Sequence, residues 1–197
     1  MTDIHFAPTD TSKNNLANEG FDRSSVYVVG NTVIDALKMV LKRIDTDDAL
    51  KEHIETSICR AGFEDLDSKF ILVTGHRREN FGQGFKNICL ALKNIAKMNP
   101  NINILYPVHM NPEVRNPINE HLLGIGNIKL VEPFQYAEFV YLMSKSYMIL
   151  TDSGGIQEEA PSIGKPVLVM RNTTERPEAA EAGTVKLVGT NHENIVN

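Results

Sequence analysis

The feature that most constrains the fold of this chain is a repeated alternation of short apolar runs with longer helical patterns. The apolar runs are rich in β-branched residues, which favour strands, whereas apolar positions recur at helical spacing in residues 84–98. Because the runs are apolar throughout, both faces of each strand are expected to be covered by helices. The expected strands lie within residues 26–30, 69–75, 102–108, 128–133, 147–152, 166–170 and 185–189.

This order of elements predicts the fold class. Strands that alternate with helices form right-handed βαβ units, which build an open parallel sheet. We therefore predict an α/β fold with an open parallel sheet and helices on both faces. In such sheets a ligand binds beyond the carboxyl ends of the strands, so the loops after the strands are the places to examine for chemistry.

Composition and charge exclude several other classes of protein. The net charge of −5 provides no positive field for nucleic acid or for an anionic membrane, and no apolar run approaches the roughly 20 residues of a membrane helix. The first ten residues lack the pattern of a secretory signal. Cys59 and Cys89 stand apart from other Cys and His residues, so we interpret them as reduced thiols and expect no metal site. These features favour a cytoplasmic location.

Cationic side chains follow two of the expected strands. His76, Arg77 and Arg78 come directly after the strand in residues 69–75, where a helix is about to begin. Such a loop suits an anion, most plausibly a phosphate, although a solvated loop with Arg–Glu pairs is an equally good interpretation. His109 follows the neighbouring strand and is either a binding residue or an ordinary polar loop residue.

The stretch "TDSGGIQEEA" after the strand in residues 147–152 has the character of a phosphate loop. Thr151, Asp152 or Ser153 could cap the following helix, and Gly154 and Gly155 remove side chains where a ligand could approach the backbone. Their N–H groups could then contact a phosphate. The alternative is a capped helix with no ligand.

Two further groups complete the candidate site. Only one of the adjacent Glu158 and Glu159 can face a ligand, and a carboxylate at this place can accept hydrogen bonds from ribose hydroxyls. Arg176 stands at the start of a helix that Pro177 should open and Gly183 should end. Its alternative role is a surface ion pair with a neighbouring glutamate.

The segments "VTGHRREN", "YPVHMNP", "TDSGGIQEEAPSIGKPVLVMRNTTERPEA" and "GTVKLVGT" closely resemble the non-hydrolysing UDP-N-acetylglucosamine 2-epimerases. The resemblance extends over nearly the whole chain. It implies the Rossmann-like second, UDP-binding lobe of a two-lobed enzyme of the GT-B type, with residues 1–29 as the end of the first lobe and residues 30–197 as the UDP-binding lobe.

The resemblance also implies roles for individual residues. His76 would be the active-site histidine near the diphosphate. The remaining substrate-binding residues would be Phe134, Phe139, Ser153, Gly154, Gly155, Glu159 and Arg176, with Arg77 and His109 at the position of an activating second nucleotide-sugar. Phe134 stands where some relatives have glutamine. A backbone contact to the uracil would survive this change to phenylalanine, whereas a side-chain contact would not.

In the reaction that the resemblance implies, UDP leaves C1 as the C2 proton is removed, and UDP then adds back to the 2-acetamidoglucal intermediate. Neither NAD nor a metal is required. The carboxylates for proton transfer belong to the first lobe, so this chain alone is expected to be inactive.

Three alternatives stay open at this point. The chain is part of a split or truncated epimerase whose other half supplies the acid–base groups, or it binds UDP without chemistry of its own. The third alternative is the nucleotide-sugar lobe of a GT-B glycosyltransferase, against which the segment "TERPEA" argues. The intact enzyme is expected to be a homodimer, and the chain is expected to be truncated at both ends.

Overall fold

The structure is a computed structural model, and it describes residues 2–197. The chain divides into two compact units, which meet between Met39 and Val40 inside helix α2 (Thr32–Thr46). The sequence suggests a domain boundary some ten residues earlier, between residues 29 and 30, and that boundary stays a prediction. Within the described residues, no helix is both long enough and apolar enough to cross a bilayer.

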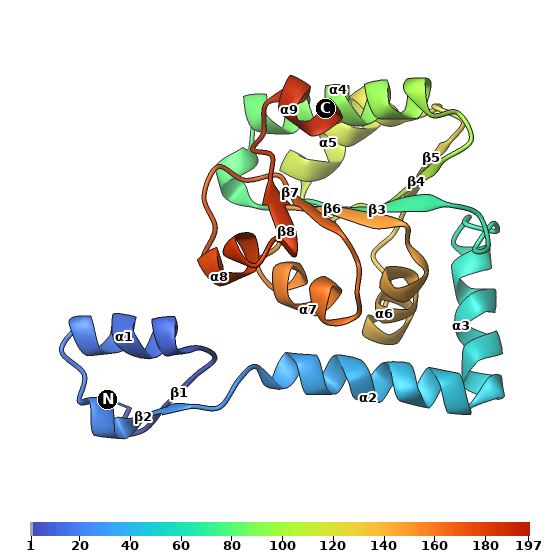
Figure 1. Ribbon diagram of the computed structural model, residues 1–197. Helices are drawn as coiled ribbons and strands as arrows, with labels where there is room; N and C mark the ends of the chain where they lie inside the picture. Colours follow the sequence, from blue (N-terminus) through green and yellow to red (C-terminus); the bar gives the residue numbers. More distant parts are fainter. Residues whose placement is uncertain (1) are drawn as a thin grey trace. The chain divides into compact units, whose positions relative to one another are not determined.

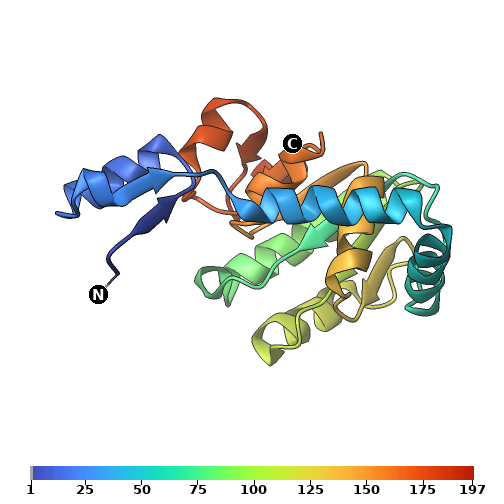
Figure 2. The same cartoon turned by 90° about the horizontal axis from the view of Figure 1, so that it is seen from below.

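The first unit is built around a pair of parallel strands (Figure 2). Its elements in chain order are β1 (His5–Ala7), α1 (Asp10–Asn18), the 3-10 helix η1 (Arg23–Ser25) and β2 (Val26–Val28). Thr9 caps α1 by accepting a hydrogen bond from the Ser12 N–H at 3.1 Å, which fixes the start of the connection between the strands. Large apolar side chains on this unit, including Phe6 and Tyr27, are exposed.

The second unit contains a six-stranded sheet in which all neighbouring strands are parallel (Figure 1). In spatial order the strands are β5 (Ile128–Val131), β4 (Asn103–Pro107), β3 (Phe70–Thr74), β6 (Met148–Thr151), β7 (Val167–Val169) and β8 (Val185–Leu187). The strand order changes direction between β3 and β6. Such a switch point is where open α/β sheets usually bind ligands.

Helices cover both faces of this sheet, as the sequence predicts. Helices α4, α5 and α9 lie on one face and α6, α7 and α8 on the other (Figure 1), with α6 and α7 nearer the viewer in Figure 2. The bounds of these helices are α4 (Gln83–Met98), α5 (Pro112–Leu122), α6 (Tyr136–Lys145), α7 (Ile156–Ser162), α8 (Pro177–Glu181) and α9 (His192–Val196). The second unit also contains α3 (Asp48–Arg60) and the 3-10 helix η2 (Arg78–Asn80).

The core lies between the sheet and these helices. Helix α4 buries Phe85, Ile88, Cys89 and Leu92, which are among the positions whose helical spacing predicts an apolar face. Tyr106 on β4 is also fully buried, and its hydroxyl donates a hydrogen bond of 3.2 Å to the Gly75 carbonyl. The end of β3 is therefore held by a side chain from the adjacent strand.

Candidate functional site

The loops after β3, β4, β5 and β6 surround one cavity at the carboxyl edge of the sheet. Its volume is about 250 Å³, and its lining includes His76, His109, Phe134, Phe139 and Ser153. Five of the predicted site residues therefore come together at the switch point, although they are spread over almost eighty positions of sequence. Parallel strands end at one edge, and this geometry brings the loops together.

Three larger cavities lie elsewhere in the described structure. One, of about 390 Å³, is lined by Lys165 and Lys186 beside β7 and β8, and another, of about 430 Å³, lies beside α3 at Glu55 and Cys59. The third, of about 370 Å³, is lined by Arg171 and by residues that follow β8. None of the three contains a predicted site residue. The smaller cavity is the better candidate because polar groups from several strand ends converge on it.

The two histidines of the cavity stack on each other. The centroids of the His76 and His109 rings are 5.3 Å apart, and the ring planes differ by 16°. The Nδ1 atom of His109 accepts a hydrogen bond of 3.1 Å from the Asn111 N–H, so His109 is free to donate through Nε2. The His76 side chain is nearly half exposed, which leaves its ring accessible to a ligand.

The aromatic wall of the cavity comes from the segment that leads into α6. Phe134 lies in the loop after β5, and Phe139 lies in the first turns of α6; both side chains are half-buried. Gln135 starts the helix as part of a capping box with Glu138, which fixes the path of the chain between the two rings. Such a wall can stack a nucleobase or pack against a sugar ring.

The prediction that Thr151, Asp152 or Ser153 caps α7 is wrong. Helix α7 begins after Gly155, and no side chain caps it. The Thr151 hydroxyl instead accepts a hydrogen bond of 2.9 Å from the Ser153 N–H. The Asp152 carboxylate is turned away from the helix and toward the loop after β3.

Sequence reasoning missed this role of Asp152. Its side chain is fully buried and accepts hydrogen bonds from the His76 N–H at 3.0 Å, the Arg77 N–H at 2.9 Å and the Asn80 side chain at 3.1 Å. A carboxylate that accepts several N–H bonds can be buried, and Nδ1 of the His76 ring also lies 3.9 Å from Oδ1 of Asp152. Asp152 therefore fixes the backbone that carries His76.

The glycines of the turn leave space that neighbouring side chains use. A Cβ atom on Gly154 would lie 3.2 Å from Nη2 of Arg77 and 3.7 Å from Glu175. A Cβ atom on Gly155 would lie 3.2 Å from Glu159. The turn is therefore tightly surrounded by charged groups.

The structure separates the two adjacent glutamates. Glu158 pairs with Arg176, whereas Glu159 is 9% exposed and accepts a hydrogen bond of 3.4 Å from the Tyr136 hydroxyl. Burial raises the pKa of Glu159, while the bond from Tyr136 opposes this shift. Glu159 is thus the member of the pair beside the glycine turn.

Arg176 stands where the sequence places it, directly before α8. Pro177 opens that helix and Gly183, with φ of +70°, follows its end, and both features confirm predictions. The predicted alternative pairs Arg176 with an adjacent glutamate, but its guanidinium pairs with Glu158 on α7. This contact joins the loop after β7 to the first turn of α7.

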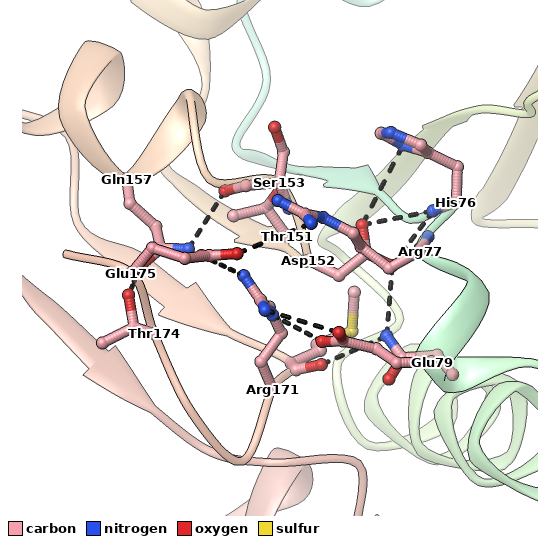
Figure 3. A network of polar contacts seen from close by, with 12 residues as sticks. His76, Arg77, Glu79, Thr151, Asp152, Ser153, Gln157, Arg171, Thr174 and Glu175 are labelled. Carbon is pink, nitrogen blue, oxygen red and sulfur yellow. Dashed lines mark hydrogen bonds and ion pairs between the residues drawn. The ribbon is translucent and has the colours of Figure 1, made fainter. Parts of the chain in front are cut away.

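A network of charged side chains also crosses the site (Figure 3). Arg171, 5% exposed, donates to Glu79 from the loop after β3 and to Glu175 from its own loop. Glu175 also lies 3.6 Å from Arg77. Sequence reasoning missed Arg171, although its place immediately after an apolar strand pattern was a usable signal.

The predicted site residues thus form two groups. His76, His109, Phe134, Phe139 and Ser153 line the cavity. The others lie around it in the glycine turn and the charged network: Arg77, Gly154, Gly155, Glu159 and Arg176.

Comparison with known proteins shows the family. The sequence pattern of the family described as UDP-N-acetylglucosamine 2-epimerase matches residues 1–197. UDP-N-acetylglucosamine 2-epimerase from Campylobacter jejuni is 57% identical over 196 residues, which are 100% of this chain and 51% of the relative.

Solved structures agree. The enzyme from Neisseria meningitidis, described as bound to UDP-GlcNAc, is 53% identical with a TM-score of 0.92. The match covers 99% of this chain and 52% of that enzyme's chain. The enzyme from Methanocaldococcus jannaschii, described as in complex with UDP-GlcNAc and UDP, is 33% identical with a TM-score of 0.85. The match covers 99% of this chain and 52% of that enzyme's chain.

The fold is therefore that of a Rossmann-like lobe of a GT-B-type enzyme, as the resemblance implies. The chain belongs to the UDP-N-acetylglucosamine 2-epimerase family. It spans about half the length of the relatives that it matches.

Proposed function

We propose that this chain supplies the UDP-binding half of a non-hydrolysing UDP-N-acetylglucosamine 2-epimerase, an isomerase that interconverts UDP-N-acetylglucosamine and UDP-N-acetylmannosamine. The observation that carries the proposal is the convergence of two imidazoles, two aromatic rings and Ser153 on one cavity at the switch point of the sheet. Family membership supports the choice of nucleotide-sugar.

Each part of the proposed site fits one part of the ligand. The N–H groups of Ser153, Gly154 and Gly155 would hold the phosphates together with His76. Glu159 would accept hydrogen bonds from the ribose, and Arg176 would complete the pocket. The aromatic wall of Phe134 and Phe139 would hold the uracil, while Arg77 and His109 would contact an activating nucleotide-sugar.

The chemistry of this half is the stabilisation of UDP as a leaving group. Negative charge grows on the diphosphate as the bond to C1 breaks, and preorganised N–H groups and cations lower the energy of that state. Removal of the C2 proton and its return need a positioned base and acid. We propose that carboxylates of a first lobe supply them, in the same polypeptide or in a second one.

The family context extends the proposal to the assembly. We propose that the complete enzyme is a cytoplasmic homodimer that serves polysaccharide biosynthesis. A glycosyltransferase lobe has the same fold, and the teichoic acid polymerase TagF resembles this chain at 19% identity with a TM-score of 0.54. That likeness concerns the fold alone, so no observation favours transfer of a sugar over epimerisation.

Calorimetric titration of the chain tests the proposal. UDP should bind, and free N-acetylglucosamine should bind far more weakly, because the candidate contacts address phosphate and ribose. His76→Ala should weaken UDP binding. Equal responses to the two compounds, or no response to UDP, would contradict the proposed function.

A further inference from the structure

Charged side chains from two loops meet over the glycine turn (Figure 3). Arg77 comes from the loop after β3 and Glu175 from the loop after β7, and Nη1 of Arg77 lies 3.6 Å from Oε1 of Glu175. Both side chains also lie within 4 Å of the place where a Cβ atom on Gly154 would stand. The carboxylate of Glu175 thus lies next to a turn whose N–H groups are otherwise suited to binding an anion.

The carboxylate of Glu175 is firmly held from its other side. The buried guanidinium of Arg171 donates to Glu175 and, at 2.6 Å, to Glu79. The hydrogen bond from Arg171 holds the pKa of Glu175 below its usual value, so Glu175 is ionised at neutral pH. A guanidinium that is itself nearly inaccessible to water fixes the position of this negative charge.

The contact between Glu175 and Arg77 is of a different kind. A separation of 3.6 Å is too long for a good hydrogen bond, and the two side chains are 36% and 47% exposed, with Arg77 the less exposed. Exposed ion pairs of this kind contribute little to stability. Arg77 can therefore exchange partners at small cost, whereas Glu175 stays on Arg171.

We propose that Glu175 holds Arg77 over the glycine turn while the site is empty, and that a phosphate must compete with this carboxylate for Arg77. The inference rests on the proposed function, which places the phosphates of UDP at residues 153–155. It gives Arg77, which that function assigns to the activating nucleotide-sugar, a contact with these phosphates as well, because Arg77 lies beside Gly154. Glu175 then determines specificity. Only a ligand with enough negative charge takes Arg77 away, which favours a diphosphate over a nucleoside or a neutral sugar.

Two matched variants test this role. Glu175→Gln and Glu79→Gln each remove one carboxylate from Arg171, and the two side chains are about equally exposed. Only Glu175 also contacts Arg77. Glu175→Gln should tighten UDP binding roughly three- to tenfold at low ionic strength, and the gain should shrink at high ionic strength because the competition is electrostatic. Glu79→Gln should leave affinity within about twofold.

The opposite pattern would overturn the proposal. Three results would do so: Glu175→Gln only weakens binding, tightens it by an amount that salt does not change, or acts like Glu79→Gln. Each of these results means that Glu175 supports the loop and does not compete with the ligand.

A second measurement uses the wild-type chain and inorganic pyrophosphate, so it depends neither on variant folding nor on uridine recognition. The guanidinium NMR signals of Arg77 and Arg171 are followed, with assignment by Arg77→Lys. The Arg77 signal should shift while that of Arg171 stays; a shift of Arg171 alone, or of neither signal, contradicts the proposal. If pyrophosphate shifts Arg77 but UDP binds no better than N-acetylglucosamine, the competition stands and the proposed function fails.

Discussion

At the scale of single residues, the site depends on which of two identical side chains faces the glycine turn. The sequence places Glu158 and Glu159 side by side and does not separate them by type. In the structure Glu158 pairs with Arg176, whereas Glu159 contacts Tyr136 and lies beside Gly155. The partner that decides between them, Arg176, lies in another loop of the chain.

Glu159→Ala should therefore weaken UDP binding by about 1–3 kcal/mol, the usual cost of losing a hydrogen bond to a charged group. Titration calorimetry measures the change. Glu52→Ala, the same substitution at an exposed position of α3, is the control and should leave the affinity unchanged. An unchanged affinity in Glu159→Ala would mean that Glu159 does not hold the ribose.

The lowered pKa of Glu175 leads us to expect that the stability of the chain depends on pH. Its pKa is lowered in the folded chain, chiefly by the hydrogen bond from Arg171, so its contribution is present above the ordinary carboxylate pKa and is lost as the pH falls through the lowered value. Glu175→Gln should reduce the free energy of unfolding at neutral pH by about 1 kcal/mol or less, because the group is exposed. Urea unfolding at several pH values should show the wild-type advantage fading in acid. An advantage that persists unchanged there would exclude this ion pair as its source.

At the scale of elements, much of the fold could be predicted from the sequence. Apolar runs and helical spacing indicate the strands of the large sheet and the helices that cover it, because these patterns are local. The cap on α7 was predicted wrongly because Asp152 finds donors in a loop more than seventy residues earlier. The partners of Arg171 were missed for the same reason, since no local pattern encodes contacts between separate strand ends.

The end of β3 offers a test of packing between elements. A Cβ atom on Gly75 would lie 2.8 Å from the hydroxyl of Tyr106, whose fully buried ring cannot move aside freely. Gly75→Ala should reduce the free energy of unfolding by roughly 1–3 kcal/mol through overpacking. Denaturant unfolding measures the change.

Tyr106→Phe is the matched partner of this substitution in a double-mutant cycle. It removes the clashing oxygen, so the double variant should lose less stability than the sum of the two single variants. Strictly additive losses would show that the hydroxyl is not what opposes a side chain at position 75.

At the scale of the whole molecule, the proposed function would give this chain one side of a reaction that needs two. In that function the candidate contacts of the second unit would address the leaving group, and His76, which lines the cavity, would be its strongest candidate for proton transfer. One group cannot easily reach both faces of C2, and cleft closure against a first lobe is needed to exclude water. The assignment of the sugar chemistry to that lobe stays a prediction.

We expect that the purified chain alone does not epimerise UDP-N-acetylglucosamine. Proton NMR in D₂O should show no deuterium at C2 and no manno epimer, whereas both should appear after addition of the complementary first lobe. His76→Ala should lower turnover in that mixture. Deuterium incorporation by the isolated chain would place the acid–base groups within residues 1–197.

The order of the strands also determines when the site can first exist during synthesis of the chain. In the six-stranded sheet β3 pairs with β4 and β4 with β5, while β6 pairs with β7 and β7 with β8. These pairings join strands that are consecutive in sequence, and only the pairing of β3 with β6 does not. As the chain leaves the ribosome, β3, β4 and β5 can associate early. The pairing of β3 with β6, next to which the cavity lies, requires closure of a long loop and therefore forms late. The ability to bind ligand is thus expected to report that the two halves of the sheet have joined.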